Sequence, residues 1–280
     1  MLKKVAAYVL GAALIAWIVF CAAVYVAPQY FFYNPTNEKP SLEEAKSKGF
    51  GAKEVRYRAA DDTELYGWFI PPQKGKKVIV YFHGNSYNIG AFYPKLQPFV
   101  DEGYGAFIGE NRGFGGIKGK LSEQNLAQDA KAAVKYLNSL GYRPSDMILY
   151  GMSMGSYTAT TVAAEYGRRG EPFAGVVLEV PFDSILNVVR QRIWPVFPFE
   201  WIVKDKFDNT SNIKAIKTRL LIMGGSKDRT VPYERAQALF ETAEEPKNIV
   251  IYTGADHSEL YQYGNWRGIL AWIKENEKAE

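Results

Sequence analysis

The sequence is poor in the residues that build cross-linked or metal-based folds. Its 280 residues include one cysteine, Cys21, and two histidines, His83 and His257. One cysteine excludes a disulfide framework within the chain and a zinc site made of several cysteines of one chain. The formal net charge is only +4 and no dense Lys/Arg stripe is present. The composition therefore argues against nucleic acid as the main partner.

The chain also lacks internal repeats and low-complexity tracts. Hydrophobic residues make up 47% and charged residues 23% of the chain, which is typical of a globular protein and not of a disordered one. A chain of this length can bury a substantial core as one large α/β domain with a small insertion.

Charged residues are missing from residues 5–27, an apolar run of 23 residues. As a helix the run would extend about 34 Å, enough to cross a hydrocarbon core of about 30 Å. The aromatic cluster at 30–33 that follows is typical of a membrane–water interface. The alternative is a cleaved signal peptide, with a weak cleavage site at 21–23, but signal h-regions are usually only about 7–15 residues long. The length of the run favours a transmembrane anchor that is retained and that comprises residues 1–27.

The orientation of this anchor follows from the lysines around it. Lys3 and Lys4 precede the span and favour a cytoplasmic N-terminus, with the large domain on the periplasmic, extracellular or lumenal side. Lys39, Lys46 and Lys48 follow the span and weaken this bias.

The rest of the chain alternates between strand-like and helix-like patterns. Residues 28–52 are expected to form a juxtamembrane linker with one short helix. Strands are expected at 53–59, 64–70, 77–82, 105–110, 147–151, 175–180, 219–224 and 248–253. Helices are expected at 89–101, 122–140, 154–168, 232–243 and 258–277. This order predicts an eight-stranded, mostly parallel sheet with helices on both faces, and an antiparallel pair of strands at one edge. The domain is expected to span 53–280, with a small lid at 181–213.

Ser153 lies in a G-x-S-x-G pattern directly after a predicted strand. In such an elbow the serine backbone is strained, and the residues two positions away must be small; Gly151 and Gly155 satisfy this. The pattern is common by chance, so a base and an acid have to accompany it. Without them Ser153 would be only a residue of a glycine-rich loop.

A base and an acid follow two later strands. His257 lies just past the last strand and Asp228 past the one before it. An open α/β sheet binds ligands at the carboxyl ends of its strands, and the order Ser, Asp, His is that of an α/β-hydrolase triad. The competing interpretations are a surface or capping role for His257 and an Asx-turn or helix cap for Asp228.

The loop after the third strand begins with His83 and Gly84. In this fold that loop supplies one backbone N–H of an oxyanion hole, and the residue after the nucleophile supplies the other. The predicted donors are Asn85 and Met154. His83 itself is expected to be a hydrogen-bonding residue of the loop and not a second base.

These motifs resemble those of the α/β-hydrolase superfamily. Together with "DDTELYGWFIPP" and the N-terminal anchor, they resemble more narrowly its single-pass, membrane-anchored serine hydrolases. The resemblance covers about residues 53–265 and rests on "YFHGNSYNIG", "NRGFGG", "GMSMGS", "LEVPFDS", "LLIMGGSKDRTVP" and "GADHSEL". Two stretches depart from the usual pattern. Asn111-Arg112-Gly113-Phe114-Gly115 stands where Tyr-Arg-Gly-Tyr-Gly is commoner, and Asp61-Asp62 replaces Asp-Gly.

The resulting hypothesis is a serine hydrolase that works through Ser153, His257 and Asp228 without a metal or organic cofactor. Aromatic residues of the predicted lid and the anchor favour an ester or thioester with an apolar acyl chain, such as a lipid ester; these residues are Trp194, Phe197, Phe199 and Trp201. One alternative is a peptidase or amidase that uses the same triad. The other is a membrane-tethered binding domain without catalysis, although such relatives usually lose part of the triad.

Overall fold

The computed structural model describes residues 1–192 and 198–277, and its centre is one large β-sheet. The strands lie in the order β10-β9-β8-β7-β4-β6-β3-β2. Their bounds are β2 Lys53–Arg58, β3 Glu64–Ile70, β4 Val78–Phe82, β6 Gly105–Gly109, β7 Met147–Met152, β8 Gly175–Glu179, β9 Leu220–Gly225 and β10 Lys247–Tyr252. All pairs from β6 to β10 are parallel, while β3 is antiparallel to both β2 and β6. This is the predicted α/β-hydrolase fold.

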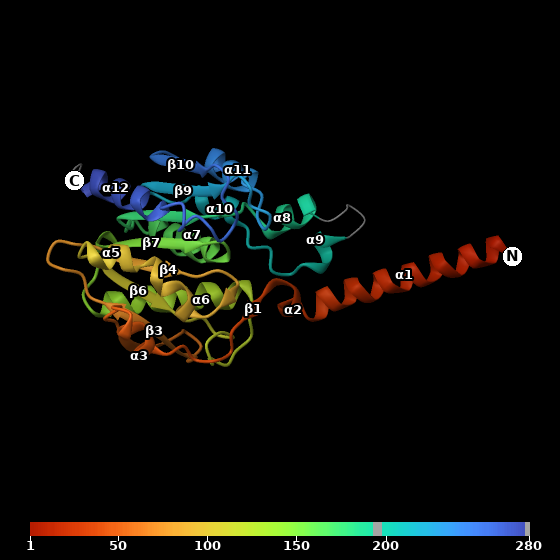
Figure 1. The fold of residues 1–280 in the computed structure, drawn as a ribbon, viewed down its shortest axis with the longest axis horizontal. Coiled ribbons are helices and arrows are strands. Elements are labelled where there is room, and N and C mark those ends of the chain that lie inside the picture. The colour runs from red at the N-terminus through yellow and green to blue at the C-terminus, as the bar shows by residue number, and fades with distance from the viewer. Residues whose placement is uncertain (193–197, 278–280) are drawn as a thin grey trace.

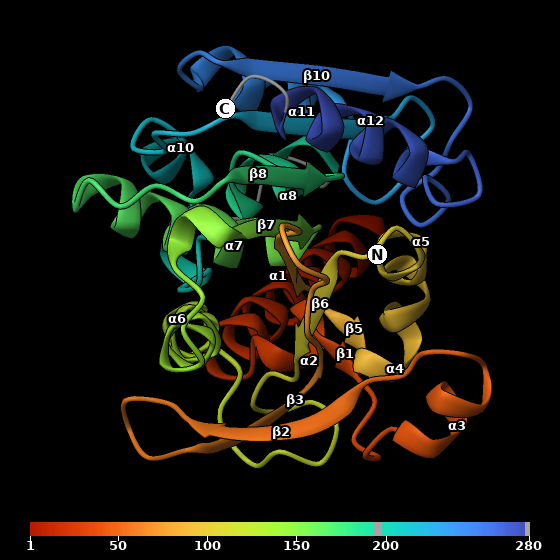
Figure 2. The same ribbon diagram turned by 90° about the vertical axis from the view of Figure 1, so that its left-hand side faces the viewer.

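Helices cover both faces of the sheet, as Figure 2 shows for α6 and α7 on one face and α4, α5 and α12 on the other. Their bounds are α4 Ile89–Phe92, α5 Gln97–Asp101, α6 Glu123–Ser139, α7 Met154–Arg168, α11 Glu234–Thr242 and α12 Asn265–Glu277, with 3₁₀ turns η1 Tyr93–Lys95 and η2 Pro144–Asp146. The central strands β4, β7 and β8 are buried along their whole length. Burial on both faces explains their continuous apolar sequences.

Two predicted helices differ from the structure. The helix expected at 89–101 is broken into α4, η1 and α5, because Pro94 and Pro98 each start a new turn instead of continuing the previous one. The helix expected at 258–277 begins only at Asn265, since hydrogen-bonded turns fill the residues between His257 and that point.

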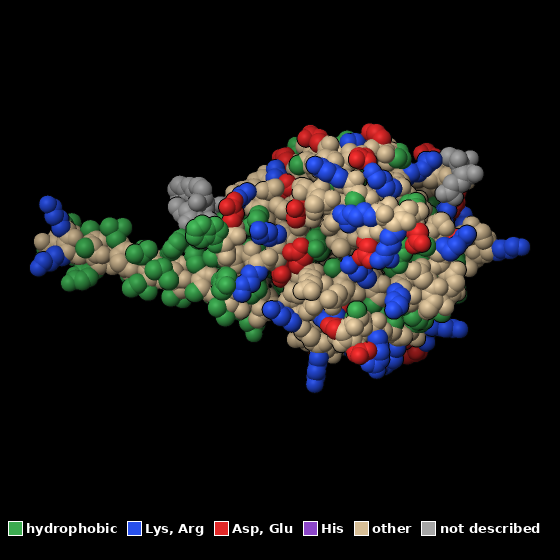
Figure 3. All heavy atoms as spheres, turned by 180° about the vertical axis from the view of Figure 1, so that it is seen from behind, with side chains coloured by type: hydrophobic (Ala, Val, Ile, Leu, Met, Phe, Trp, Pro, Cys, Tyr) green, Lys and Arg blue, Asp and Glu red, His purple; other side chains and the backbone are tan. Residues whose placement is uncertain are grey.

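The N-terminal helix α1 (Leu2–Val26) projects from the domain as a rod (Figure 1). It is long and apolar enough to cross a membrane, with a mean hydropathy of 2.5 over its best window. The short helix α2 (Gln29–Phe32) follows at its base. Figure 3 shows that hydrophobic side chains cover this rod and continue onto the adjoining end of the domain.

The segment expected to be a linker, residues 28–52, is packed into the domain. It contains the predicted short helix, α3 (Leu42–Ser47), but its buried side chains also include Tyr33, Phe50 and Ala52. Its strand β1 (Asn34–Pro35) pairs in parallel with β5 (Ser86–Tyr87), in a small second sheet that the sequence does not predict. Strands of two residues carry no alternating pattern from which to predict them.

The predicted lid contains three short helices in its described part: α8 (Ile185–Arg192), α9 (Phe199–Ile202) and α10 (Asn209–Ile213). Trp194 and Phe197 lie outside the described residues. Helix α9 packs on the last turns of α1, in an apolar cluster of buried residues that consists of Cys21, Val24, Phe199, Ile202 and Val203. Trp201, in contrast, is 82% exposed.

Candidate active site

Ser153 lies in the tight turn between β7 and α7. Its backbone angles, φ 52° and ψ −119°, are in a region that side chains other than glycine rarely adopt. Both flanking glycines are required for space: a Cβ on Gly155 would lie 2.0 Å from the Phe82 carbonyl oxygen, and one on Gly151 would lie 2.4 Å from the Gly155 carbonyl oxygen. The strained serine between two close-packed glycines is the geometry of a nucleophile elbow.

Ser153, His257 and Asp228 form one hydrogen-bonded chain. His257 Nε2 lies 2.9 Å from Ser153 Oγ, and His257 Nδ1 lies 2.7 Å from Asp228 Oδ2. Ser153 and Asp228 are buried, with 7% and 9% of their surface exposed. The structure therefore brings the three predicted residues together, although 104 residues separate Ser153 from His257 along the chain.

The Asx-turn considered for Asp228 is also present, and it is compatible with the contact to His257. Oδ1 of Asp228 accepts the N–H groups of Thr230 and Val231 at 2.8 and 2.7 Å. Its other oxygen, Oδ2, contacts the imidazole. The turn therefore fixes the orientation of the carboxylate that faces His257.

A second aspartate, which the sequence reasoning missed, ties the loop of Asp228 to the loop of His257. Asp256 Oδ1 accepts the N–H of His257 at 2.8 Å and that of Arg229 at 2.9 Å, and its Oδ2 accepts from Arg229 Nε at 2.7 Å. These donors lower the pKa of Asp256 to about 2. The sequence signal for this ion pair is that Asp256 directly precedes His257 and Arg229 directly follows Asp228.

The predicted oxyanion donors lie on the two segments that flank Ser153. Met154 is the first residue of α7, where N–H groups have no partner within the helix. Asn85 follows Gly84, and a Cβ on Gly84 would lie 3.5 Å from Ser153 Cβ, so this loop runs directly against Ser153.

His83 is buried beneath this loop, and both of its ring nitrogens have partners. Nδ1 lies 2.8 Å from the Gly84 carbonyl oxygen, and Nε2 lies 2.9 Å from Asn111 Nδ2 and 3.1 Å from Glu110 Oε1. These contacts agree with the expected hydrogen-bonding role and leave His83 unavailable as a second base.

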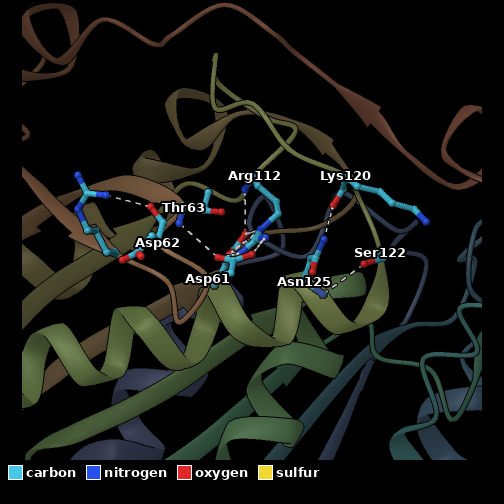
Figure 4. Close-up of polar contacts among 9 residues, drawn as sticks. Asp61, Asp62, Thr63, Arg112, Lys120, Ser122 and Asn125 are labelled. Atoms are coloured by element: carbon cyan, nitrogen blue, oxygen red, sulfur yellow. Dashed lines mark hydrogen bonds and ion pairs between the residues drawn. The ribbon is translucent and has the colours of Figure 1, made fainter.

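The loop after β6 is held by a partly buried ion-pair network around Arg112 (Figure 4). The Arg112 guanidinium lies 2.6 Å from Asp129 and 2.5 Å from Asp61, and its backbone N–H also donates to Asp129. Burial raises the pKa of Asp129, while the hydrogen bond from Arg112 lowers that of Asp61. Asp62 has a positive φ of 62°, which aspartate tolerates better than most residues.

Within residues 1–192 and 198–277, no group of three or more His, Cys, Asp or Glu side chains is placed to hold a metal ion. The fold and this site together define the chain as an α/β hydrolase. The chain belongs to the prolyl oligopeptidase family, whose profile matches residues 91–279.

Individual proteins are similar to this chain in sequence or in fold. The uncharacterised protein YfhR of Escherichia coli O157:H7 is 26% identical over 255 residues, which cover 87% of this chain and 85% of YfhR. The esterase Pf2001 of Pyrococcus furiosus has the same fold with a TM-score of 0.68 and 22% identity, over 87% of this chain and 97% of the esterase. The acylaminoacyl peptidase of Pyrococcus horikoshii has a TM-score of 0.61 and 16% identity, over 78% of this chain and 40% of the peptidase.

Proposed function

We propose that this chain is a serine hydrolase that cleaves carboxylic esters or thioesters through Ser153, His257 and Asp228. The observation that carries the proposal is the hydrogen-bonded chain from Ser153 Oγ through the imidazole to Asp228, at the carboxyl ends of the strands. Ser153 Oγ attacks the acyl carbonyl while His257 takes its proton. His257 then gives that proton to the departing alcohol or thiol, and water hydrolyses the acyl-enzyme with His257 again as base.

The remaining site residues have supporting roles in this proposal. Asp228 holds the imidazole in the tautomer that accepts the serine proton and stabilises its charged form. The N–H groups of Asn85 and Met154 stabilise the oxyanion, each donor contributing about 3–4 kcal/mol. No step needs a metal or an organic cofactor.

An apolar acyl chain is the substrate class that the surroundings favour. Met154 belongs to an apolar cluster beside Ser153 that also contains Phe114, Tyr157, Phe182 and Val188. Helices α8 and α9 of the lid lie between this cluster and α1, and they contribute to the apolar cluster on the anchor. A lipid ester in the membrane would therefore enter beside the lid.

We further propose that α1 is retained as a single-pass anchor, with residues 1–27 in the membrane and the catalytic domain on the non-cytoplasmic side. The proposal is supported by the length and hydropathy of α1 and by Lys3 and Lys4 before it. Helix α9 of the lid then lies beside the bilayer, because it packs on Cys21 and Val24 within the last two turns of α1.

A peptidase or amidase on the same triad is the second candidate. It is favoured by the family itself and by the fold shared with an acylaminoacyl peptidase. The chain matches only 40% of that peptidase. A direct comparison of an ester with the amide of the same acyl group distinguishes the two functions.

The test uses the detergent-solubilised full chain beside Ser153→Ala and His257→Ala. We expect a fluorophosphonate probe to label the parent and neither variant, and p-nitrophenyl esters to be cleaved faster than the matching anilides. A folded parent that neither labels nor cleaves any ester or amide would contradict catalysis. The remaining alternative would then be a membrane-tethered binding domain.

A further inference from the structure

The segment that leaves the anchor contacts the oxyanion loop at both the backbone and the side chain of Asn85. The N–H of Asn34 donates to the Asn85 carbonyl oxygen at 2.8 Å. The Asn85 side-chain amide donates from Nδ2 to the Phe32 carbonyl oxygen, also at 2.8 Å. Two residues further on, the N–H of Thr36 donates to the Tyr87 carbonyl oxygen at 3.0 Å, which completes the β1–β5 pairing.

The same segment also reaches the second proposed donor. Tyr33, between Phe32 and Asn34, is buried in the apolar cluster that contains Met154. Its ring lies edge-on to Phe207, with ring centroids 6.5 Å apart, and Phe207 in turn packs on Tyr157 of α7. Three consecutive residues therefore contact the Asn85 loop directly, through Phe32 and Asn34, and reach α7 through the ring of Phe207.

We propose that residues 32–36 are a positioning segment of the oxyanion hole, so that the chain leaving the membrane is part of the active site. The inference rests on the proposed hydrolase function. Holding the carbonyl and the side chain of Asn85 fixes its Cα and the peptide plane that follows it. The Asn85 N–H lies in the preceding rigid plane, which can then turn only about the φ bond of Asn85, so the direction of the N–H is restricted as well. An oxyanion hole depends on such preorganisation, because its donors must already point to where the charge develops. Residues 32–36 act through Asn85 and Met154 and do not touch the substrate.

Two substitutions in the full chain remove the contacts to Asn85 one at a time. Asn85→Ala keeps the proposed donor N–H but removes the bond to Phe32. Asn34→Pro removes the N–H that donates to the Asn85 carbonyl. The backbone before this position accepts proline, because Tyr33 is extended, with φ −128° and ψ 144°. The proline ring carbon also takes the place of the N–H against the Asn85 carbonyl, so the substitution both removes the donor and pushes the two segments apart.

Matched variants separate positioning from general loss of structure. Asn34→Ala removes the same exposed side chain but keeps the N–H, so it isolates the contribution of the donor in Asn34→Pro. Asn88→Ala is the control for Asn85→Ala, because Asn88 donates from its side chain to the Glu38 carbonyl at 2.9 Å, within the same two segments. The Asn88 side chain also caps α4, so the Asn88→Ala variant should be less stable than the parent, but we expect the variant's kcat/KM to stay within twofold of the parent value.

The measurements are kcat and KM for a p-nitrophenyl ester, and the inhibition constant of an alkyl trifluoromethyl ketone. This ketone adds to Ser153 Oγ and forms a tetrahedral adduct whose oxyanion needs the same donors. For Asn85→Ala and Asn34→Pro we expect kcat to fall about 10- to 100-fold with KM changed less than about threefold. The inhibition constant should rise by the same factor as kcat/KM falls, and this parallel would not arise from a merely structural role.

The outcomes separate this inference from the proposed function. An inactive parent that fails to label at Ser153 contradicts the function itself. An active parent, with both variants within twofold of it, overturns the positioning role. The role is equally refuted if kcat/KM falls while the inhibition constant stays unchanged, or if Asn88→Ala loses as much activity as Asn85→Ala.

Discussion

Gly155→Ala tests whether the elbow depends on the contact between α7 and β4. The added Cβ would lie 2.0 Å from the Phe82 carbonyl oxygen, 2.6 Å from the Phe82 carbonyl carbon and 2.7 Å from the His83 carbonyl oxygen. All three atoms belong to the backbone at the end of β4, so no side chain can rotate away. The helix and the strand have to separate by about 1 Å or more to restore ordinary contacts.

This separation has two separate costs. Overpacking of this kind destabilises a core by about 1–3 kcal/mol, which corresponds to a lowering of Tm by roughly 2–12 °C for a domain of this size. The separation also moves Met154 at the start of α7 away from Asn85, which follows β4 three residues later. A displacement of about 1 Å at a catalytic site can cost on the order of 100-fold in rate, so kcat/KM should fall by about that factor.

The assay pairs thermal unfolding with kcat/KM for a p-nitrophenyl ester. Gly51→Ala is the control, because an added Cβ there meets no atom within 4 Å and the backbone φ is not in the positive range. We expect the control to keep both stability and activity. If Gly155→Ala unfolds within about 2 °C of the parent and keeps a third or more of its activity, the packing argument for the elbow is refuted.

Three further predictions concern the surroundings of the site. Asp256→Asn should lower the unfolding free energy at neutral pH, as measured by urea unfolding. Because the folded-state pKa of Asp256, about 2, lies below the unfolded value of about 3.9, the difference from the parent should persist above pH 4 and vanish as the pH falls through 2. Asp129→Asn leaves the buried Arg112 short of a partner and should cost about 3–5 kcal/mol by urea unfolding, against less than about 1 kcal/mol for the half-exposed Asp61→Asn. Trp201→Ser should slow hydrolysis of a long-chain ester in vesicles about three- to tenfold and leave hydrolysis of a soluble short-chain ester unaffected, because interfacial tryptophans anchor a protein surface to the bilayer. An equal loss of activity on both substrates would contradict contact of the lid with the membrane.

The sheet and the order of its strands follow closely from the sequence, because buried parallel strands are continuous apolar runs bounded by turn residues. β2 and β3 have the predicted bounds to within one residue, and the predicted antiparallel edge is present. The positions of Ser153, Asp228 and His257 are predictable for a similar reason. Each follows the carboxyl end of a parallel strand, and these ends lie on the same side of the sheet.

The contacts that the sequence does not predict are those made by isolated polar groups between distant segments. Nothing local in the sequence around Asn34 shows that its N–H faces Asn85, since the bond is between backbone groups. Asp256 and Arg229 are 27 residues apart, and their ion pair exists only because β9 and β10 are neighbours in the sheet. The burial of Phe50 and Ala52 is equally a product of the tertiary fold, in a segment whose composition resembles a linker.

The family match does not extend over the whole fold. The match begins at residue 91, after Asn85 and after the whole segment from the anchor to β5. Ser153, Asp228 and His257 therefore lie inside the part that matches the prolyl oligopeptidase family, whereas the contacts on Asn85 lie before it. If the anchor spans the bilayer, its exit point is joined through Phe32 and Asn34 to the residue that we propose as an oxyanion donor. A change in how α1 leaves the membrane would then act on the rate of the chemical step through two hydrogen bonds, and not only on access to the substrate.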